Sequence, residues 1–136
     1  MEYSFKIQFG DTDPAGIVYY PNYYRWMDNA THELFNTINY PTRSLKEKNI
    51  VTPLLEANCV FKSPGYYHHT ITIQTDVEYV KSKVFKLRHT FYDNDTLLAE
   101  GYEVRAWVSI ENEQLKATTI PDDIRTELEK LIKVNV

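Results

Sequence analysis

Residues 21–36 read Pro-Asn-Tyr-Tyr-Arg-Trp-Met-Asp-Asn-Ala-Thr-His-Glu-Leu-Phe-Asn, and this stretch decides the fold. Because proline is well placed at the first position of a helix, the stretch predicts a helix from Pro21 to about Asn36. Apolar side chains cover two neighbouring stripes of that helix, and only Asp28, His32 and Glu33 leave a polar edge. A helix that is apolar over so much of its surface is normally buried. The stripes are Tyr24, Met27, Thr31, Leu34 and Phe35, and Tyr23, Trp26 and Ala30.

Outside this helix the apolar residues alternate with a period of two, which is typical of strands. Asp93-Asn94-Asp95 has the composition of a hairpin turn. In the last predicted strand, Tyr102, Val104, Ala106, Val108 and Ile110 share one face. The predicted strands are residues 3–9, 52–61, 71–79, 83–92 and 96–110.

Two further helices are expected. A short one is weakly indicated near residues 42–48, and a terminal one starts at Pro121, where Asp122 and Asp123 in the first turn suit the helix dipole. A chain of 136 residues has only one sheet of about five strands with which to cover the long helix. The prediction is an α+β fold, a single domain over residues 1–136, in which a five-stranded antiparallel sheet wraps one central helix and a C-terminal helix lies outside. An exposed sheet edge favours association with further copies of the chain.

Composition excludes several classes of function. The net charge of -4 argues against a nucleic-acid partner, which usually meets a basic surface. Cys59 is the single cysteine and cannot form an internal disulfide, which suits a reducing, cytoplasmic location. The N-terminus lacks the basic-then-apolar pattern of a signal peptide, and no apolar run approaches the ~20 residues that span a bilayer.

Chemistry is concentrated in the turn that precedes the long helix, Asp11-Thr12-Asp13-Pro14-Ala15-Gly16. The turn places a carboxylate close to a helix N-terminus, whose free N–H groups can stabilise a developing oxyanion. Pro21 has no N–H, so the candidate donors are Tyr20 and its neighbours. A carboxylate beside such donors can act as a nucleophile or as a general base toward water. Alternatively, Asp11 or Asp13 could only cap the backbone of a turn.

Residues 9–26 read Phe-Gly-Asp-x-Asp-Pro-Ala-Gly-Ile-Val-x-Tyr-Pro-Asn-Tyr-x-Arg-Trp, where x marks positions outside the pattern. This segment resembles the signature of the 4-hydroxybenzoyl-CoA thioesterase family of hotdog-fold enzymes, strongly over residues 5–30 and less so beyond. The resemblance implies the hotdog fold, hydrolysis of an acyl-CoA thioester, a homodimer building to a homotetramer, and no metal or cofactor other than the coenzyme A of the substrate.

The resemblance also implies roles for individual residues. Asp13 falls on the catalytic carboxylate, and the Tyr20 N–H falls on the donor that polarises the thioester carbonyl. Gly16 permits close approach of the substrate, and Asp11 is expected to organise the loop. The substrate-binding residues are expected to include Tyr19, Pro21, Tyr23 and Tyr24, and tyrosines in this region, with Tyr66 and Tyr67, could equally serve core or interface packing.

Coenzyme A phosphates are expected on a basic hairpin. In the family this cluster lies between the third and fourth strands, at positions matched here by Lys81, Ser82 and Lys83. One usually basic position is the serine, so Lys62, Lys86 or Arg88 could share the phosphate contact. The alternative for Lys81 and Lys83 is an ordinary solvated turn.

Other kinds of site find little support. His68, His69 and His89 show no metal-ligand spacing, and no Gly-x-Ser-x-Gly or phosphate-loop motif occurs. Asp28 and His32 could form a catalytic pair, although such a pair is more often a modest surface interaction. Two alternative functions stay open: a hotdog hydratase or dehydratase, which would need a histidine near the carboxylate, and a non-catalytic module that binds acyl-CoA or an acyl carrier.

Overall fold

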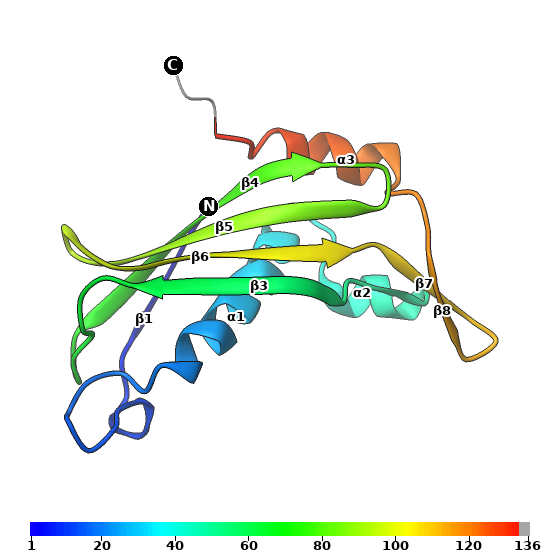
Figure 1. Cartoon of the computed structure of the whole chain (residues 1–136). Helices are drawn as coiled ribbons and strands as arrows, with labels where there is room; N and C mark the ends of the chain where they lie inside the picture. The colour runs from blue at the N-terminus through cyan, green and yellow to red at the C-terminus, as the bar shows by residue number, and fades with distance from the viewer. Residues whose placement is uncertain (134–136) are drawn as a thin grey trace.

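The computed structural model describes residues 1–133, and Figure 1 shows one curved sheet lying over one long helix. The helices are α1 (Pro21–Thr37), α2 (Thr42–Glu47) and α3 (Asp122–Glu129), with a 3-10 turn η1 (Phe9–Asp11) before α1. The strands are β1 (Glu2–Lys6), β2 (Ile50–Val51), β3 (Leu54–Phe61), β4 (Thr70–Val80), β5 (Val84–Asp93), β6 (Thr96–Ala106), β7 (Val108–Glu111) and β8 (Gln114–Ala117).

The main sheet has five antiparallel strands in the order β1-β4-β5-β6-β3, and it wraps α1 as the sequence predicted. Strands β5 and β6 join at the predicted turn, where Asn94 has a positive φ. Helix α1 begins at Pro21 as expected, and its predicted apolar stripes are buried except at Tyr24, which is 37% exposed. The hotdog arrangement is therefore confirmed.

The predicted single strand over residues 96–110 is wrong in one respect. The chain leaves the main sheet after Ala106, and β7 belongs to a second sheet of order β2-β7-β8. Trp107 lies at the break: its N–H donates to Lys83 O (2.8 Å), its carbonyl accepts from Thr118 N–H (2.9 Å), and its side chain is buried. Burying so large a side chain at the end of the sheet redirects the chain. Strands β2 and β8, two and four residues long, were not predicted.

The two faces of β6 also differ from what hydrophobicity suggests. Gly101 lies against α1, since an added Cβ there would lie 2.6 Å from Met27 Sδ. Glu103 and Arg105 alternate with it and are buried, and on the other face Tyr102 is half-buried while Val104 and Ala106 are buried as well. The face of β6 that meets α1 is therefore the more polar one, because its charged groups find partners there.

The two edges of the main sheet differ in how far other parts of the chain cover them. Strand β1 pairs only with the first half of β4, up to Gln74. Beyond it α3 and the residues after it cover β4, with Ile132 pairing beside Val77. At the other edge, every residue of β3 except Cys59 is exposed. No helix within the described residues is long and apolar enough to cross a membrane.

Candidate active site

A tight loop connects η1 to α1. Asp13 N–H donates to Ile17 O (2.8 Å), and Gly16 N–H donates back to Asp13 O (2.9 Å). Gly16 has a φ of 79°, in the left-handed region that favours glycine. A bridge between Thr12 and Val18 closes the loop at its base. The loop backbone therefore fixes the position of the Asp13 side chain.

The two carboxylate oxygens of Asp13 have different surroundings. Oδ1 accepts hydrogen bonds from Ala15 N–H (2.9 Å) and Ile17 N–H (3.4 Å), which is the turn-capping role considered from the sequence. Within residues 1–133, Oδ2 has no hydrogen-bond partner. One oxygen of Asp13 thus holds the loop together, and the other remains available for chemistry.

The N-terminus of α1 also lacks a capping side chain. Tyr20 occupies the N-cap position without a side-chain cap, and the first turn carries no acidic residue. Val18 N–H donates to Gly65 O and Tyr19 N–H to Asp11 O, both at 2.9 Å. In the described part of the chain the Tyr20 N–H has no acceptor. An uncapped helix N-terminus with a free N–H favours a negatively charged group.

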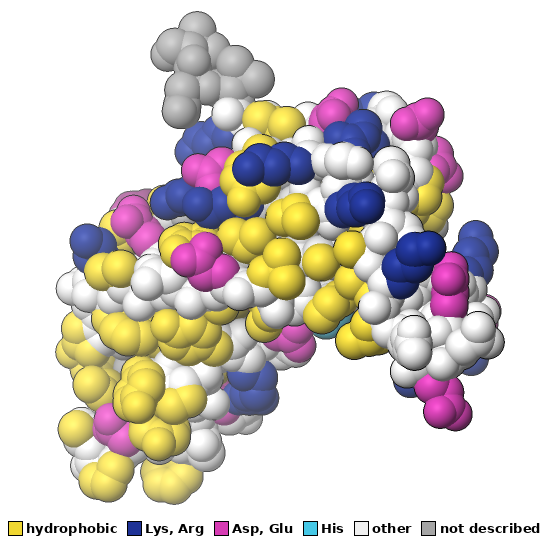
Figure 2. Space-filling view, turned by 45° about the vertical axis from the view of Figure 1, so that its right-hand side comes forward, with side chains coloured by type: hydrophobic (Ala, Val, Ile, Leu, Met, Phe, Trp, Pro, Cys, Tyr) yellow, Lys and Arg dark blue, Asp and Glu magenta, His cyan; other side chains and the backbone are white. Residues whose placement is uncertain are grey.

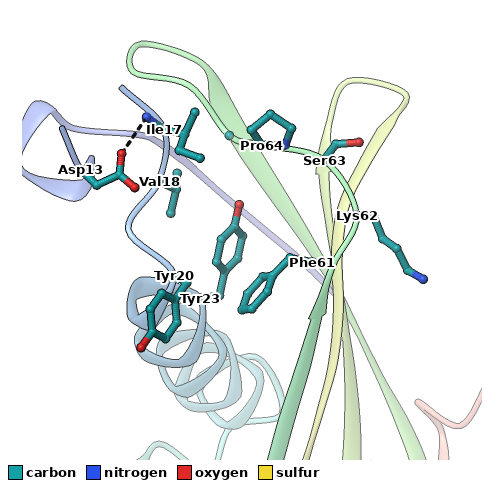
Figure 3. Close-up of a pocket in the computed structure, with 10 residues that line it drawn as sticks. Asp13, Ile17, Val18, Tyr20, Tyr23, Phe61, Lys62, Ser63 and Pro64 are labelled. Carbon is teal, nitrogen blue, oxygen red and sulfur yellow. Dashed lines mark hydrogen bonds between the residues drawn. The ribbon is translucent and has the colours of Figure 1, made fainter. Parts of the chain in front are cut away.

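Asp13 and Tyr20 line the same hollow, which has a volume of about 480 Å³. In Figure 3 the wall opposite Asp13 comes from the end of β3 and the segment after it, and the Lys62 side chain points away from the centre. The volume lies within the range of sites for small organic ligands. The lining residues are Asp13, Ile17, Val18, Tyr20, Tyr23, Phe61, Lys62, Ser63, Pro64 and Gly65.

Tyr23 is a wall of this hollow rather than an acid within it. Burial, together with the nearby Cys59, raises the pKa of the Tyr23 phenol to about 12, against a smaller opposing effect of a hydrogen bond with the Gly65 backbone. The phenol therefore stays neutral at physiological pH. Gly65 has no room for a side chain, because a Cβ there would lie 2.9 Å from Val18 Cγ2.

The other predicted substrate-binding residues lie outside the hollow. Tyr19 is 52% exposed, Tyr24 is 37% exposed, and Pro21 is exposed at the start of α1. Gly16 lines a second hollow, which shares Asp13 with the first. Hydrophobic side chains gather at this end of the molecule, at the lower left of Figure 2. The exposed aromatic residues of the loop region are Phe9, Tyr19, Tyr20, Phe61, Tyr66 and Tyr67.

The segment 62–65 supplies four of the ten lining residues, and sequence reasoning missed this role, since it considered only Lys62 and only as a phosphate contact. The segment lies between β3 and β4, and its composition indicates only a turn. Two long-range backbone contacts bring it to the loop: Val18 N–H donates to Gly65 O, and Ile17 pairs with Tyr66. No local sequence pattern reports such contacts.

The predicted phosphate-binding hairpin lies at the opposite end of the sheet. Lys81, Ser82 and Lys83 connect β4 to β5, at the right of Figure 1, whereas the Asp13 loop lies at the lower left. The 11 residues of β4 separate the two ends by roughly 35 Å. Arg125 of α3 holds the hairpin by donating to Val80 O (3.1 Å) and Lys81 O (2.6 Å). One copy of the chain therefore does not bring the hairpin to Asp13.

A second polar cluster lies buried between α1 and the sheet. His89 contacts Thr75 Oγ1 through Nδ1 (2.8 Å) and Glu103 Oε1 through Nε2 (3.0 Å), and Thr31 also donates to Glu103. Arg105 donates to Glu103 Oε2 (2.8 Å) and to Asp28 Oδ1 (2.7 Å). Burial alone would raise the pKa of Glu103, but the hydrogen bond with His89 and the Arg105 guanidinium outweigh it and lower the pKa to about 2.

The Asp28–His32 pair, a candidate catalytic pair from the sequence, lies at the margin of this cluster: Arg105 donates to Asp28, but both side chains of the pair are partly exposed. His32 Nε2 lies 3.3 Å from Asp28 Oδ1, and neither residue lines the hollow. Asp28 follows Tyr20 by about two helical turns, a rise of roughly 12 Å. Among residues 1–133, no group of three or more His, Cys, Asp or Glu side chains is arranged to hold a metal ion.

Comparison with known proteins supports this fold. The chain is 35% identical over 126 residues to 4-hydroxybenzoyl-CoA thioesterase of Pseudomonas sp. (strain CBS-3), covering 87% of this chain and 89% of that one. A solved gentisyl-coenzyme A thioesterase matches with a TM-score of 0.85 at 39% identity, over 95% of this chain and 99% of that chain. An Asp-to-Asn mutant of 4-hydroxybenzoyl-CoA thioesterase, complexed with 4-hydroxybenzoyl-CoA, matches with a TM-score of 0.85 at 31% identity, over 94% and 97% of the two chains.

These matches place the chain among hotdog-fold thioesterases. More particularly, it belongs to the family described as the thioesterase-like superfamily, whose model matches residues 7–128. The resemblance inferred from residues 9–26 is thereby confirmed.

Proposed function

We propose that this protein hydrolyses acyl-CoA thioesters to a carboxylic acid and coenzyme A, with Asp13 as the catalytic carboxylate and the Tyr20 N–H as oxyanion donor. The observation that carries the proposal is that Asp13 and Tyr20 line one hollow, and that within residues 1–133 Asp13 has a carboxylate oxygen without a hydrogen-bond partner and Tyr20 a backbone N–H without an acceptor. A thioester carbonyl needs one group of each kind. The names of the relatives agree with this reaction.

Two routes are open to Asp13. In the first, Oδ2 attacks the thioester carbonyl, coenzyme A leaves as a thiolate, and water hydrolyses the resulting aspartyl anhydride. In the second, the carboxylate takes a proton from water, whose oxygen attacks the carbonyl, and coenzyme A leaves with that proton. Either route places negative charge on the carbonyl oxygen, which the Tyr20 N–H would stabilise. The second hollow at Asp13 offers water a separate approach.

Turnover in ¹⁸O-labelled water tests the first route when water attacks the aspartyl carbonyl of the anhydride. Label recovered in the Asp13 carboxylate would identify attack by that carboxylate, because general-base catalysis exchanges none of its oxygens.

The direct test is thiol release by wild type and Asp13→Asn. Asparagine keeps an oxygen for the loop contacts of Oδ1 but is neither a nucleophile nor a base. We expect kcat to fall by ~10²-fold or more while substrate still binds. The matched control is Asp95→Asn, which removes an exposed carboxylate from the hairpin at Asn94. Equal activity of Asp13→Asn and wild type would refute the assignment, and binding without turnover by the wild type would favour the acyl-CoA binding module.

We further propose a hydroxylated aromatic acyl group. Aromatic rings form much of the wall, with Tyr23 and Phe61 at a ring-centroid distance of 5.3 Å. Relatives are named for 4-hydroxybenzoyl-CoA, gentisyl-CoA and 1,4-dihydroxy-2-naphthoyl-CoA. A panel of these aromatic thioesters beside short-chain and long-chain acyl-CoAs tests the proposal, and a preference for aliphatic chains would refute it. An acyl-carrier-protein thioester belongs in the same panel.

We propose that the reaction needs no metal and takes place in the cytoplasm. Full activity in the presence of EDTA would support the absence of a metal requirement.

The remaining parts of the proposal concern assembly. The exposed edge of β3 carries apolar side chains, with Leu55 60% exposed and Val60 48% exposed. We propose that two copies pair along β3 as a homodimer, which builds to a homotetramer. Antiparallel pairing reverses the second copy, and its hairpin Lys81–Lys83 then lies toward the Asp13 end of the first. The phosphates of coenzyme A would thus meet a hairpin from the partner chain.

Mixed dimers test this arrangement. Asp13→Asn is inactive by expectation, and a Lys81→Ala, Lys83→Ala double variant should raise KM. Subunit exchange between the two should restore a site with low KM, because one site in each mixed dimer combines an intact Asp13 with an intact hairpin. No recovery in dimers shown to be mixed would place the phosphate site within one chain. Light scattering of the wild type reports the oligomeric state, and a monomer would refute the pairing.

A further inference from the structure

Asp11 lies at the centre of a set of contacts that join the loop to α1. Its Oδ2 accepts from Gln8 N–H (2.8 Å), and its Oδ1 accepts from Arg25 Nη2 (3.0 Å). Its backbone carbonyl accepts from Tyr19 N–H (2.9 Å) and from Asn22 Nδ2 (2.8 Å). These are the contacts of a loop-organising residue, and they reach both sides of Tyr20.

Arg25 is in an unfavourable place for a cation. It is the fifth residue of α1, close to the positive end of the helix dipole. Its Nη2 contacts Asp11 Oδ1 and, at 3.3 Å, Asn22 Oδ1. The arginine side chain is 57% exposed and that of Asp11 is 15% exposed. Exposed ion pairs contribute little to folding, so stability alone gives a weak reason for this arrangement.

Of the backbone positions 19–22, these contacts leave one N–H group available as a donor. Tyr19 N–H is occupied by Asp11 O, Pro21 has no N–H, and the N–H of Asn22 donates to Tyr19 O (3.0 Å). Tyr20 N–H alone among these is without an acceptor in the described part of the chain. Because Asp11 and Tyr19 are hydrogen-bonded, they close the loop that carries Asp13. The same contacts therefore fix the free amide and the carboxylate relative to each other.

We propose that Asp11, Asn22 and Arg25 form a positioning clamp that holds the Tyr20 N–H and the Asp13 carboxylate in register for attack on the thioester carbonyl. This inference rests on the proposed function, because it assigns the clamp to that reaction. None of the three side chains lines the hollow, so they act through the loop backbone and not on the substrate. The clamp should affect the transition state more than substrate binding, since charge on the carbonyl oxygen develops only there.

The test compares Asn22→Ala, Arg25→Ala and Arg25→Lys with wild type, using the acyl-CoA that wild type hydrolyses best. A misplacement of about 1 Å can cost 10²-fold in rate, so we expect the two alanine variants to lose about 10- to 100-fold in kcat. KM should change by less than about threefold, because ground-state binding is retained. Arg25→Lys should recover part of the loss, since lysine can donate to Asp11 but does not reproduce the planar fork.

The matched control is Arg43→Ala, which removes another exposed arginine paired with a carboxylate, Glu47, at 4.0 Å. Thermal unfolding of every variant separates positioning from folding. A kcat within twofold of wild type in both alanine variants, a rise in KM alone, or a loss of rate that follows the loss of folded protein would each overturn the clamp. Asp13→Asn serves as reference: if it is inactive while the clamp variants are fully active, only the clamp is wrong, and if it is fully active, the proposed function is wrong as well.

Discussion

Two polar clusters lie along α1, and they differ in how completely their groups are paired. At the N-terminus of α1, Asp13 and Tyr20 line a hollow, and among residues 1–133 neither Asp13 Oδ2 nor the Tyr20 N–H has a hydrogen-bond partner. Further along the helix, Glu103 is 1% exposed and accepts from His89, Thr31 and Arg105. In the described residues, Arg105 Nε is the buried side-chain polar atom left without a partner.

This difference in pairing indicates which cluster can still bind a substrate. A buried charge is tolerated only when partners compensate its lost hydration, so the Glu103 cluster has little capacity left for a substrate. A carboxylate with one free oxygen beside an open helix N-terminus keeps that capacity. Strongly shifted pKa values often mark active sites, and here they occur at both places: the pKa of Glu103 is lowered to about 2 away from the hollow, and the pKa of Tyr23 on the wall of the hollow is raised to about 12. The pKa values alone therefore do not distinguish the two clusters.

The largest effect is expected for Asp13→Asn, which should lower the catalytic rate and leave the stability of the fold almost unchanged. Asp13→Asn should lower kcat by ~10³-fold, about 4 kcal/mol of transition-state stabilisation, because it removes the nucleophile or base. Its free energy of unfolding should change by less than about 1 kcal/mol, since the loop contacts of Oδ1 survive. Steady-state kinetics and urea unfolding of the same samples measure both. A large loss of stability with little loss of rate would reverse the roles given to the two clusters.

Glu103→Gln should have the opposite signature. The substitution keeps the volume but leaves Arg105 without its buried counter-charge, and breaking a buried pair is expected to cost about 3 kcal/mol. Asp28 still compensates part of that charge from the other side. The kcat of the folded fraction should stay close to that of wild type. Denaturant unfolding and active-site-normalised kinetics are the measurements, and a specific loss of kcat in fully folded protein would connect Glu103 to the chemistry.

The same interaction should appear as acid sensitivity. The pKa of Glu103 is lowered from 4.5 to about 2, so its contribution to stability is fully present above pH 4.5 and is lost as the pH falls toward 2. By pH 3 the loss from this group should reach about 2 kcal/mol. Unfolding free energies from pH 6 to pH 3 measure the slope. Glu103→Gln should flatten it, and an identical slope in both proteins would show that other groups set the acid dependence.

The smallest effect is expected at Cys59, next to the wall of the hollow. Burial raises the pKa of its thiol to about 11, so little thiolate forms near neutral pH. Iodoacetamide should label the folded protein very slowly and leave thioester hydrolysis unchanged, whereas the urea-unfolded chain should react readily. Mass spectrometry after timed labelling checks this. Rapid labelling with loss of activity would show that the thiol is open to the hollow.

The sequence predicted what short-range physics decides. Proline at the first helical position and apolar stripes on neighbouring faces predicted the extent of α1 and its burial. Period-two alternation predicted the five strands of the main sheet, and the Asp-Asn-Asp cluster predicted the hairpin at Asn94. The spacing between Asp13 and Pro21 predicted a carboxylate close to a helix N-terminus. Each of these depends on residues within a few turns or strand positions of one another.

Only the tertiary structure decided which of these groups meet. The wall at Gly65 comes from a segment about fifty residues beyond Asp13, joined by backbone contacts that no side-chain pattern encodes. The turn of the chain at Trp107 and the inward face of β6 depend on partners across the core, since Glu103 is buried only because His89 and Arg105 are there to pair with it. The burial of an apolar face can be predicted from the sequence, because exposing apolar side chains to water is unfavourable. The burial of a charged side chain depends on whether the fold places partner groups opposite it. For that reason the sequence by itself determined the long helix, the five strands of the main sheet and the candidate carboxylate, and the fold determined the hollow, the buried cluster and the contacts around Asp11.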